Sequence, residues 1–210
     1  MPETTIIAGN LDVGGDLRFR GLRLPSIPRT ELIQDDLAVF PINLASLRKA
    51  ANPAVNPVSS PTGSHAAILS GTFGTSTPYL TSGDVRDTVT GRGVEAVVQL
   101  PPSYVAGQTV KIRFSGGMLD RVATVYSKVE VRAYKLERNT TPVGSDLSAG
   151  TDPSINSTTF SGVYETLTTS TLSPGDYINL EIIISCSDGS AASACTPCIA
   201  AMDLVCDVRG

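Results

Sequence analysis

The chain has 210 residues, of which 41% are hydrophobic and 17% are charged, and its formal net charge is −4. This balance is typical of a globular protein and excludes an intrinsically disordered chain. The small net charge argues against a nucleic-acid partner. Gly, Pro, Ser and Thr are abundant, and long runs of Leu, Ala, Lys and Glu are missing. This composition favours an all-β architecture with little helix.

The first predicted element is an extended β-arm over residues 1–29, in which apolar residues recur at every second position between glycine breaks. These apolar residues are Leu11, Val13, Leu17 and Phe19. Two strands this short are marginal alone, whereas three copies around a common axis would enclose the apolar side chains and pair the open backbone edges. We therefore expect a trimer stem. The alternative is one amphipathic hairpin packed on the chain's own globular domain.

Basic residues gather in the same arm. They are Arg18, Arg20, Arg23 and Arg29. Such a patch is complementary to an acidic protein surface, which gives one interpretation of these arginines. The preferred interpretation is the solvated face of the strand, because exposed charge is the default on an alternating strand.

Residues 30–65 are predicted as a docking segment followed by a proline-rich linker. Four apolar residues recur there at roughly helical spacing: Leu32, Ile33, Leu37 and Phe40. Thr30 is a suitable N-cap and Pro41 a suitable stop, so the pattern predicts a short helix from Thr30 to Phe40. An extended docking strand fits the same residues nearly as well. The prolines that follow impose an extended linker.

Residues 66–210 predict a β-sandwich domain, because stretches of five to ten alternating residues are separated by turns rich in Gly, Pro, Asn, Asp or Ser. In one such stretch, Val129, Val131 and Ala133 alternate with charged residues, which indicates one buried and one solvated face. About eight strands of this kind suit two packed sheets of jelly-roll type.

Four cysteines lie near the C-terminus, at Cys186, Cys195, Cys198 and Cys206. The predicted strands carry Cys206 about 25 Å from the other three, so the four thiolates cannot share one zinc ion. Cys206 has the parity of its apolar neighbours and is expected to be a buried thiol. Free thiols are the default in a reducing compartment, and a disulfide among Cys186, Cys195 and Cys198 formed after release from the cell is the alternative.

The sequence predicts no catalytic residue, metal site or cofactor. Its single histidine, His65, lies in the proline-rich linker, and no Ser or Cys stands in a recognisable nucleophile motif. The loop aspartates are scattered and read as turn residues rather than calcium ligands. A secretory signal and a span of membrane length are both missing, so we expect synthesis in the cytoplasm and no membrane partner.

Several stretches of the chain resemble a group of tailed-phage virion proteins that decorate or cement the capsid shell. They are IPRTELIQDDLAVFPINL at 27–44, GTFGT at 71–75, VVQLPPSYVAGQTV at 97–110, INSTTF at 155–160 and LSPGD at 172–176. The resemblance implies a structural protein with a C-terminal jelly-roll and an N-terminal arm that engages neighbouring subunits. It implies no catalytic residue.

Taken with the resemblance, the sequence predicts a non-enzymatic homotrimer on the capsid surface of a bacteriophage virion. The expected partner is the major capsid protein, and the expected contact residues are Arg18, Arg20, Arg23, Arg29, Leu32, Leu37 and Phe40. The alternative is a tail or head fibre protein whose sandwich binds a receptor or carbohydrate. Sugar platforms depend on exposed aromatic rings, and this chain has no Trp and few Phe or Tyr.

Overall fold

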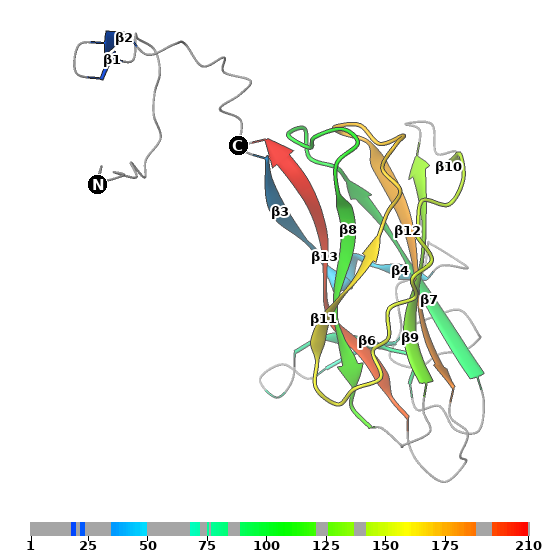
Figure 1. Cartoon of the computed structure of the whole chain (residues 1–210). Coiled ribbons are helices and arrows are strands. Elements are labelled where there is room, and N and C mark those ends of the chain that lie inside the picture. The colour runs from blue at the N-terminus through cyan, green and yellow to red at the C-terminus, as the bar shows by residue number, and fades with distance from the viewer. Residues whose placement is uncertain are drawn as a thin grey trace. The chain divides into compact units, whose positions relative to one another are not determined.

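The computed structural model describes residues 18–19, 22–23, 35–49, 68–71, 75, 77–83, 89–120, 126–136, 142–187 and 195–209. The chain divides into two compact units, Met1–Gln34 and Asp35–Gly210. In the first unit, β1 (Arg18–Phe19) pairs with β2 (Leu22–Arg23) as a short antiparallel hairpin. The second unit holds two antiparallel sheets that face each other (Figure 1).

The five-stranded sheet has the order β10-β9-β12-β7-β4. Its strands are β10 (Pro142–Val143), β9 (Tyr126–Leu136), β12 (Tyr177–Ser187), β7 (Val89–Gln99) and β4 (Arg48–Lys49). The six-stranded sheet has the order β11-β8-β13-β6-β5, and β3 pairs with β13 beyond the end of β6. Its strands are β11 (Ser161–Thr166), β8 (Val110–Met118), β13 (Pro197–Arg209), β6 (Tyr79–Thr81), β5 (Ile68–Ser70) and β3 (Asp35–Ile42).

The strands from β6 to β13 form nested antiparallel pairs. The outermost strands, β6 and β13, pair with each other, and inside them β7 pairs with β12, β8 with β11 and β9 with β10. Folding these pairs into two sheets places β8 beside β13 and β9 beside β12. This is the strand order of a jelly roll. The expected all-β sandwich is therefore confirmed.

The core lies between the two sheets and is built by alternation along the strands. In β12 the even-numbered residues from Ile178 to Ile184 are buried, and the residues between them face outward. In β9, Val129, Val131 and Ala133 are buried, as their spacing predicts. A period of two places alternate side chains on opposite faces of a sheet, so each strand buries one row.

The predicted helix from Thr30 to Phe40 is wrong for the described part of that segment, because residues 35–42 form the strand β3. β13 extends beyond β6, and its C-terminal half pairs with β3 instead. The short 3-10 helix η2 (Leu44–Ser46) then carries the chain across to β4 in the other sheet, where Leu44 and Leu47 are buried. Residues 35–49 of the expected docking and linker segment thus lie within the sandwich.

The opposite side of the sandwich is covered by residues 144–157, which we call the strap. The backbone N–H groups of Leu147 and Ile155 donate to β9 carbonyls, at 2.7 Å to Ala133 and 3.0 Å to Ser127. The strap therefore occupies the free edge of β9. Within the described residues, no helix is long and apolar enough to cross a membrane.

Candidate interaction surface

The strand β3 lies at the margin of the six-stranded sheet, beside β13 (Figure 1). On the far side of β13, Asp207 accepts from the Val105 N–H at 3.0 Å, and Arg209 donates to the Ser103 carbonyl at 2.9 Å. Odd-numbered residues of β13 therefore direct their backbone groups away from β3, and even-numbered residues direct theirs toward it. No other strand in the described ranges pairs with β3.

This geometry decides which backbone groups of β3 are already bonded. Ala38 lies opposite Cys206 and Phe40 opposite Leu204, so the even-numbered residues of β3 bond to β13. The backbone groups of Leu37 and Val39 consequently point to the open margin. Pro41 has the same parity, and a proline without an N–H is tolerated in a strand at such an edge.

The side chains of the same residues form an apolar patch on the outer face of the sheet. Leu37 is 61% exposed and Val39 is 45% exposed, whereas Val205, opposite Val39 in β13, is only 6% exposed. Val205 is covered because Val39 and Lys111 flank it on the two neighbouring strands. We call Leu37, Val39, Pro41 and Val205 the β3 face.

Two acidic residues of β13 next to the β3 face have partners within the sheet. Asp203 accepts from Arg113 at 2.9 Å from Nε and 2.8 Å from Nη2, and this contact raises the pKa of the Arg113 guanidinium. Asp207 accepts from the Thr109 N–H at 2.9 Å. Farther out, Lys111 Nζ lies 5.9 Å from the centre of the Tyr164 ring. The outer face is thus apolar at its margin, and Asp203 and Asp207 behind the margin are hydrogen-bonded.

Of the predicted contact residues, the structure places Leu37 on the β3 face. Phe40 lies on the core side opposite Leu204, and it is 36% exposed because its strand is at the margin. Arg18 pairs with Arg23, and Phe19 with Leu22, in the separate β1–β2 hairpin. The other predicted stem and contact residues lie outside the described residues: Leu11, Val13, Leu17, Arg20, Arg29 and Leu32.

Sequence reasoning missed Val39, Pro41 and Val205 as members of one surface. The signal was present in the stretch DLAVFPI, where Leu37, Val39 and Pro41 alternate with Ala38, Phe40 and Ile42. A period of two in this stretch indicates a strand. The helical spacing that includes Leu32 predicts a helix over the same residues, so the sequence supports two different structures there.

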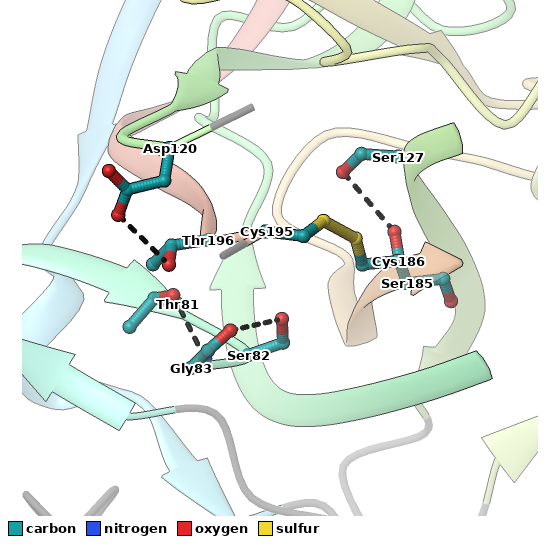
Figure 2. The surroundings of a disulfide bond; sticks show 9 residues. All are labelled: Thr81, Ser82, Gly83, Asp120, Ser127, Ser185, Cys186, Cys195 and Thr196. Carbon is teal, nitrogen blue, oxygen red and sulfur yellow. Dashed lines mark hydrogen bonds between the residues drawn. A yellow bond between two sulfur atoms is a disulfide. The ribbon is translucent and has the colours of Figure 1, made fainter. Parts of the chain in front are cut away.

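At the other end of the sandwich, Cys186 and Cys195 form a disulfide (Figure 2). Cys186 belongs to β12 in one sheet, and Cys195 precedes β13 in the other, so the bond ties the two sheets together. With Met118 the two cysteines form a small buried cluster. Figure 2 shows the bond between two polar contacts, from Ser127 Oγ to the Ser185 carbonyl at 3.3 Å and from Thr196 Oγ1 to Asp120 Oδ2 at 3.4 Å.

The remaining two cysteines, Cys198 and Cys206, are buried thiols. Burial raises the pKa of each thiol from 9.0 to about 11. A thiol with such a pKa is almost wholly protonated at neutral pH and is a poor nucleophile or metal ligand. In the part of the chain that the structure describes, no group of three or more His, Cys, Asp or Glu residues could hold a metal ion. His65 lies outside that part.

Neither a protein-family model nor a curated protein sequence matches the chain. Among solved structures, a chain from the structure of infectious bursal disease virus, Gx strain, is similar with a TM-score of 0.29 and 14% sequence identity. The match covers 90% of this chain and 54% of the viral chain, so this chain spans about half the length of that neighbour.

Proposed function

We propose that this protein is a non-enzymatic structural component of a phage virion, which decorates the capsid shell and stabilises it as a trimer. The observation that carries the proposal is the β3 face. Leu37 and Val39 are exposed on it, while the neighbouring charges of Arg113 and Asp203 neutralise each other. A surface of this kind suits burial against another protein, because apolar area is covered there and the adjacent Arg113–Asp203 pair needs no new partner.

The fold agrees with this role without requiring it. Jelly rolls are common in viral capsid and lectin domains, and fold alone does not decide function. The sequence resemblance to phage decoration proteins adds the capsid shell as the partner. The rigid sandwich and the basic N-terminal arm then have separate tasks: the sandwich forms the body, and the arm engages neighbouring subunits.

In the proposed mechanism, the arms of three copies intertwine through Leu11, Val13, Leu17 and Phe19. Each trimer then presents several weak contact surfaces to the shell on one body. After the first contact forms, the others bind at high effective concentration, and weak individual contacts become lasting attachment.

The trimer is tested by the solution mass of the full chain beside the variants Leu17→Asp and Phe19→Asp, with Val97→Asp as a control. Val97 is an exposed apolar residue of the sandwich, far from the arm in sequence. We expect the arm variants to lose the threefold association while their sandwiches stay folded. A threefold association that survives both arm variants contradicts the stem.

The capsid contact is tested separately by binding of the protein to shells of the parent phage. Joint replacement of Arg18, Arg20 and Arg23 by Ser should weaken salt-sensitive binding without dissociating the trimer, because screened charge attraction would be lost. Binding that is unchanged at every salt concentration assigns these arginines to the solvated face.

The alternative function, a fibre protein whose sandwich binds a carbohydrate, needs aromatic rings gathered on one platform. The exposed Tyr126 and Tyr177 lie at opposite ends of the five-stranded sheet, opposite Ser187 and Leu136. Ten residues of strand separate them, which is about 33 Å. The exposed Tyr164 lies on the other sheet, with Lys111 near its ring. Reproducible binding of the full chain on a glycan array would nevertheless favour the fibre protein.

A further inference from the structure

We infer that β3 is a joint between copies of this chain, where it pairs antiparallel with the β3 of a second copy across a twofold axis. The two six-stranded sheets then become one continuous sheet. This inference deepens the proposed function, since it gives decorating trimers a lateral connection. It does not depend on the arm and is testable without it.

The backbone of β3 directs hydrogen-bonding groups toward the position that a second strand would occupy. The N–H and C=O groups of Asp35, Leu37 and Val39 face the margin where no other strand of the described ranges pairs, as the bonding of the even-numbered residues to β13 requires. An exposed apolar edge strand with free backbone groups is a template for another strand. The opposite side of the sandwich has no such edge along β9, because the strap occupies it.

The strand is self-complementary in one register. With the twofold axis at Ala38, Leu37 lies opposite Val39 of the second copy, and the two residues exchange both backbone hydrogen bonds. Asp35 lies opposite Pro41 and donates to its carbonyl. The bond that Pro41 cannot donate is therefore missing only at the ends of the new ladder.

The side chains fit the same register. Leu37 and Val39 of one copy meet Val39 and Leu37 of the other, and these exposed apolar residues form two cross-strand pairs on the outer face. The acidic positions stay apart, because the two Asp36 positions are offset by four residues along the ladder, or about 13 Å. This offset exceeds the range of strong charge repulsion at physiological salt.

A second copy of β3 fits the margin better than the arm of a neighbouring chain. In the arm, Arg18 and Phe19 already pair with Arg23 and Leu22 in the β1–β2 hairpin. The β3 sequence instead places its apolar residues at the centre of the joint and its acids at the ends. Docking of an arm remains a distinct outcome of the experiment below, because it would be lost with the arm.

The experiment measures solution mass by light scattering at several concentrations, for the full chain carrying Phe19→Asp to disable the arm. We expect this variant to be a dimer, and we expect the added change Val39→Pro to make it a monomer. Proline at 39 removes an N–H that faces the margin and no hydrogen bond to β13, so the changed side chain over Val205 and the fixed φ should lower the thermal unfolding midpoint only slightly. A monomer before the change, or a dimer after it, overturns the inference.

Side-chain variants keep the test independent of any folding defect in Val39→Pro. Leu37→Lys should also give monomers, since it places a charge at the centre of the joint. Val97→Lys is the matched control, because Val97 is 58% exposed but lies on the other sheet. Dimers that persist in Leu37→Lys, or that are lost equally in Val97→Lys, contradict the joint.

Cysteine pairs test the register directly. Leu37 and Val39 of the second copy form a hydrogen-bonded pair with Cα atoms about 5.5 Å apart, which is within disulfide range. An oxidised mixture of Leu37→Cys and Val39→Cys chains should therefore give crosslinked dimers. Each variant alone should crosslink less, because like positions are diagonal neighbours about 7–8 Å apart and lie beyond the usual disulfide range. Equal crosslinking in the mixture and in the single variants, or none in either, rejects this register.

Discussion

The Cγ2 methyl of Ile155 occupies the space directly above Gly116. A Cβ atom at position 116 would lie 2.5 Å from this methyl, which is far inside van der Waals contact. Ile155 is buried in the strap, and Gly116 belongs to β8. The absence of a side chain at 116 therefore lets the strap close the side of the sandwich.

Replacing Gly116 by Ala should destabilise the protein by about 1–3 kcal/mol, because the buried Ile155 cannot move away without disturbing the core. The matched control is Gly162→Ala in the neighbouring strand β11, where a Cβ would meet nothing within 4 Å. Urea unfolding measures both variants. Equal stabilities for the two, or full additivity of Gly116→Ala with Ile155→Ala, would show that the close contact has no energetic role.

The buried carboxylate of Glu165 in β11 accepts hydrogen bonds from the strap. It accepts from the Gly150 N–H at 2.9 Å, from the Thr151 N–H at 3.4 Å and from the Thr151 hydroxyl. Glu165→Ala should lower the free energy of unfolding by about 1–3 kcal/mol, because buried donors are left without an acceptor. The control Glu181→Ala breaks only an exposed pair with Arg132, for which we expect at most about 1 kcal/mol. Similar losses in both variants would count against this role.

The disulfide between Cys186 and Cys195 closes a short loop, with a sequence separation of 9. Its reduction should lower the free energy of unfolding by about 2–3 kcal/mol, because the unfolded chain regains the entropy of an open loop. Urea unfolding with and without a reductant measures this. The variant Cys186→Ala/Cys195→Ala is the control, and its midpoint should not respond to the reductant. An unchanged midpoint for the wild-type chain would contradict the stabilising role.

The buried thiols of Cys198 and Cys206 predict a loss of stability at alkaline pH. Burial raises the pKa of each from 9.0 to about 11. At neutral pH both thiols are protonated in the folded and the unfolded chain. Between pH 9 and 11 the unfolded chain releases these protons and the folded chain keeps them, so the free energy of unfolding falls as pH rises.

Urea unfolding at pH 8, 9 and 10 measures this dependence. The variant Cys198→Ala/Cys206→Ala should show a flatter decline over the same range, although it is less stable at every pH because of the cavities it creates. A decline as steep as that of the wild-type chain would assign the alkaline sensitivity to other groups.

The strands of the core were predictable from the sequence because apolar residues recur at every second position within each strand. Ile178 to Ile184 and Val129 to Ala133 alternate with polar or less apolar residues and have one buried row each, as the pattern requires. The segment before Pro41 fits both a helical spacing and the period of two of a strand. The structure has a strand there, so the helix prediction was wrong. The strand is selected by pairing with the C-terminal half of β13, about 160 residues away in the chain, and no local pattern reports that pairing.

The sequence by itself determined the β class, the burial of the core rows and the burial of Cys206, since these depend on local alternation and composition. The tertiary structure alone decided that Cys186 bonds to Cys195, that Ile155 covers Gly116 and that Leu37, Val39 and Val205 share one face. Each of these relationships joins residues from different strands or loops. Their register is set by how the two sheets pack and by which edges are left open, and no local period encodes that.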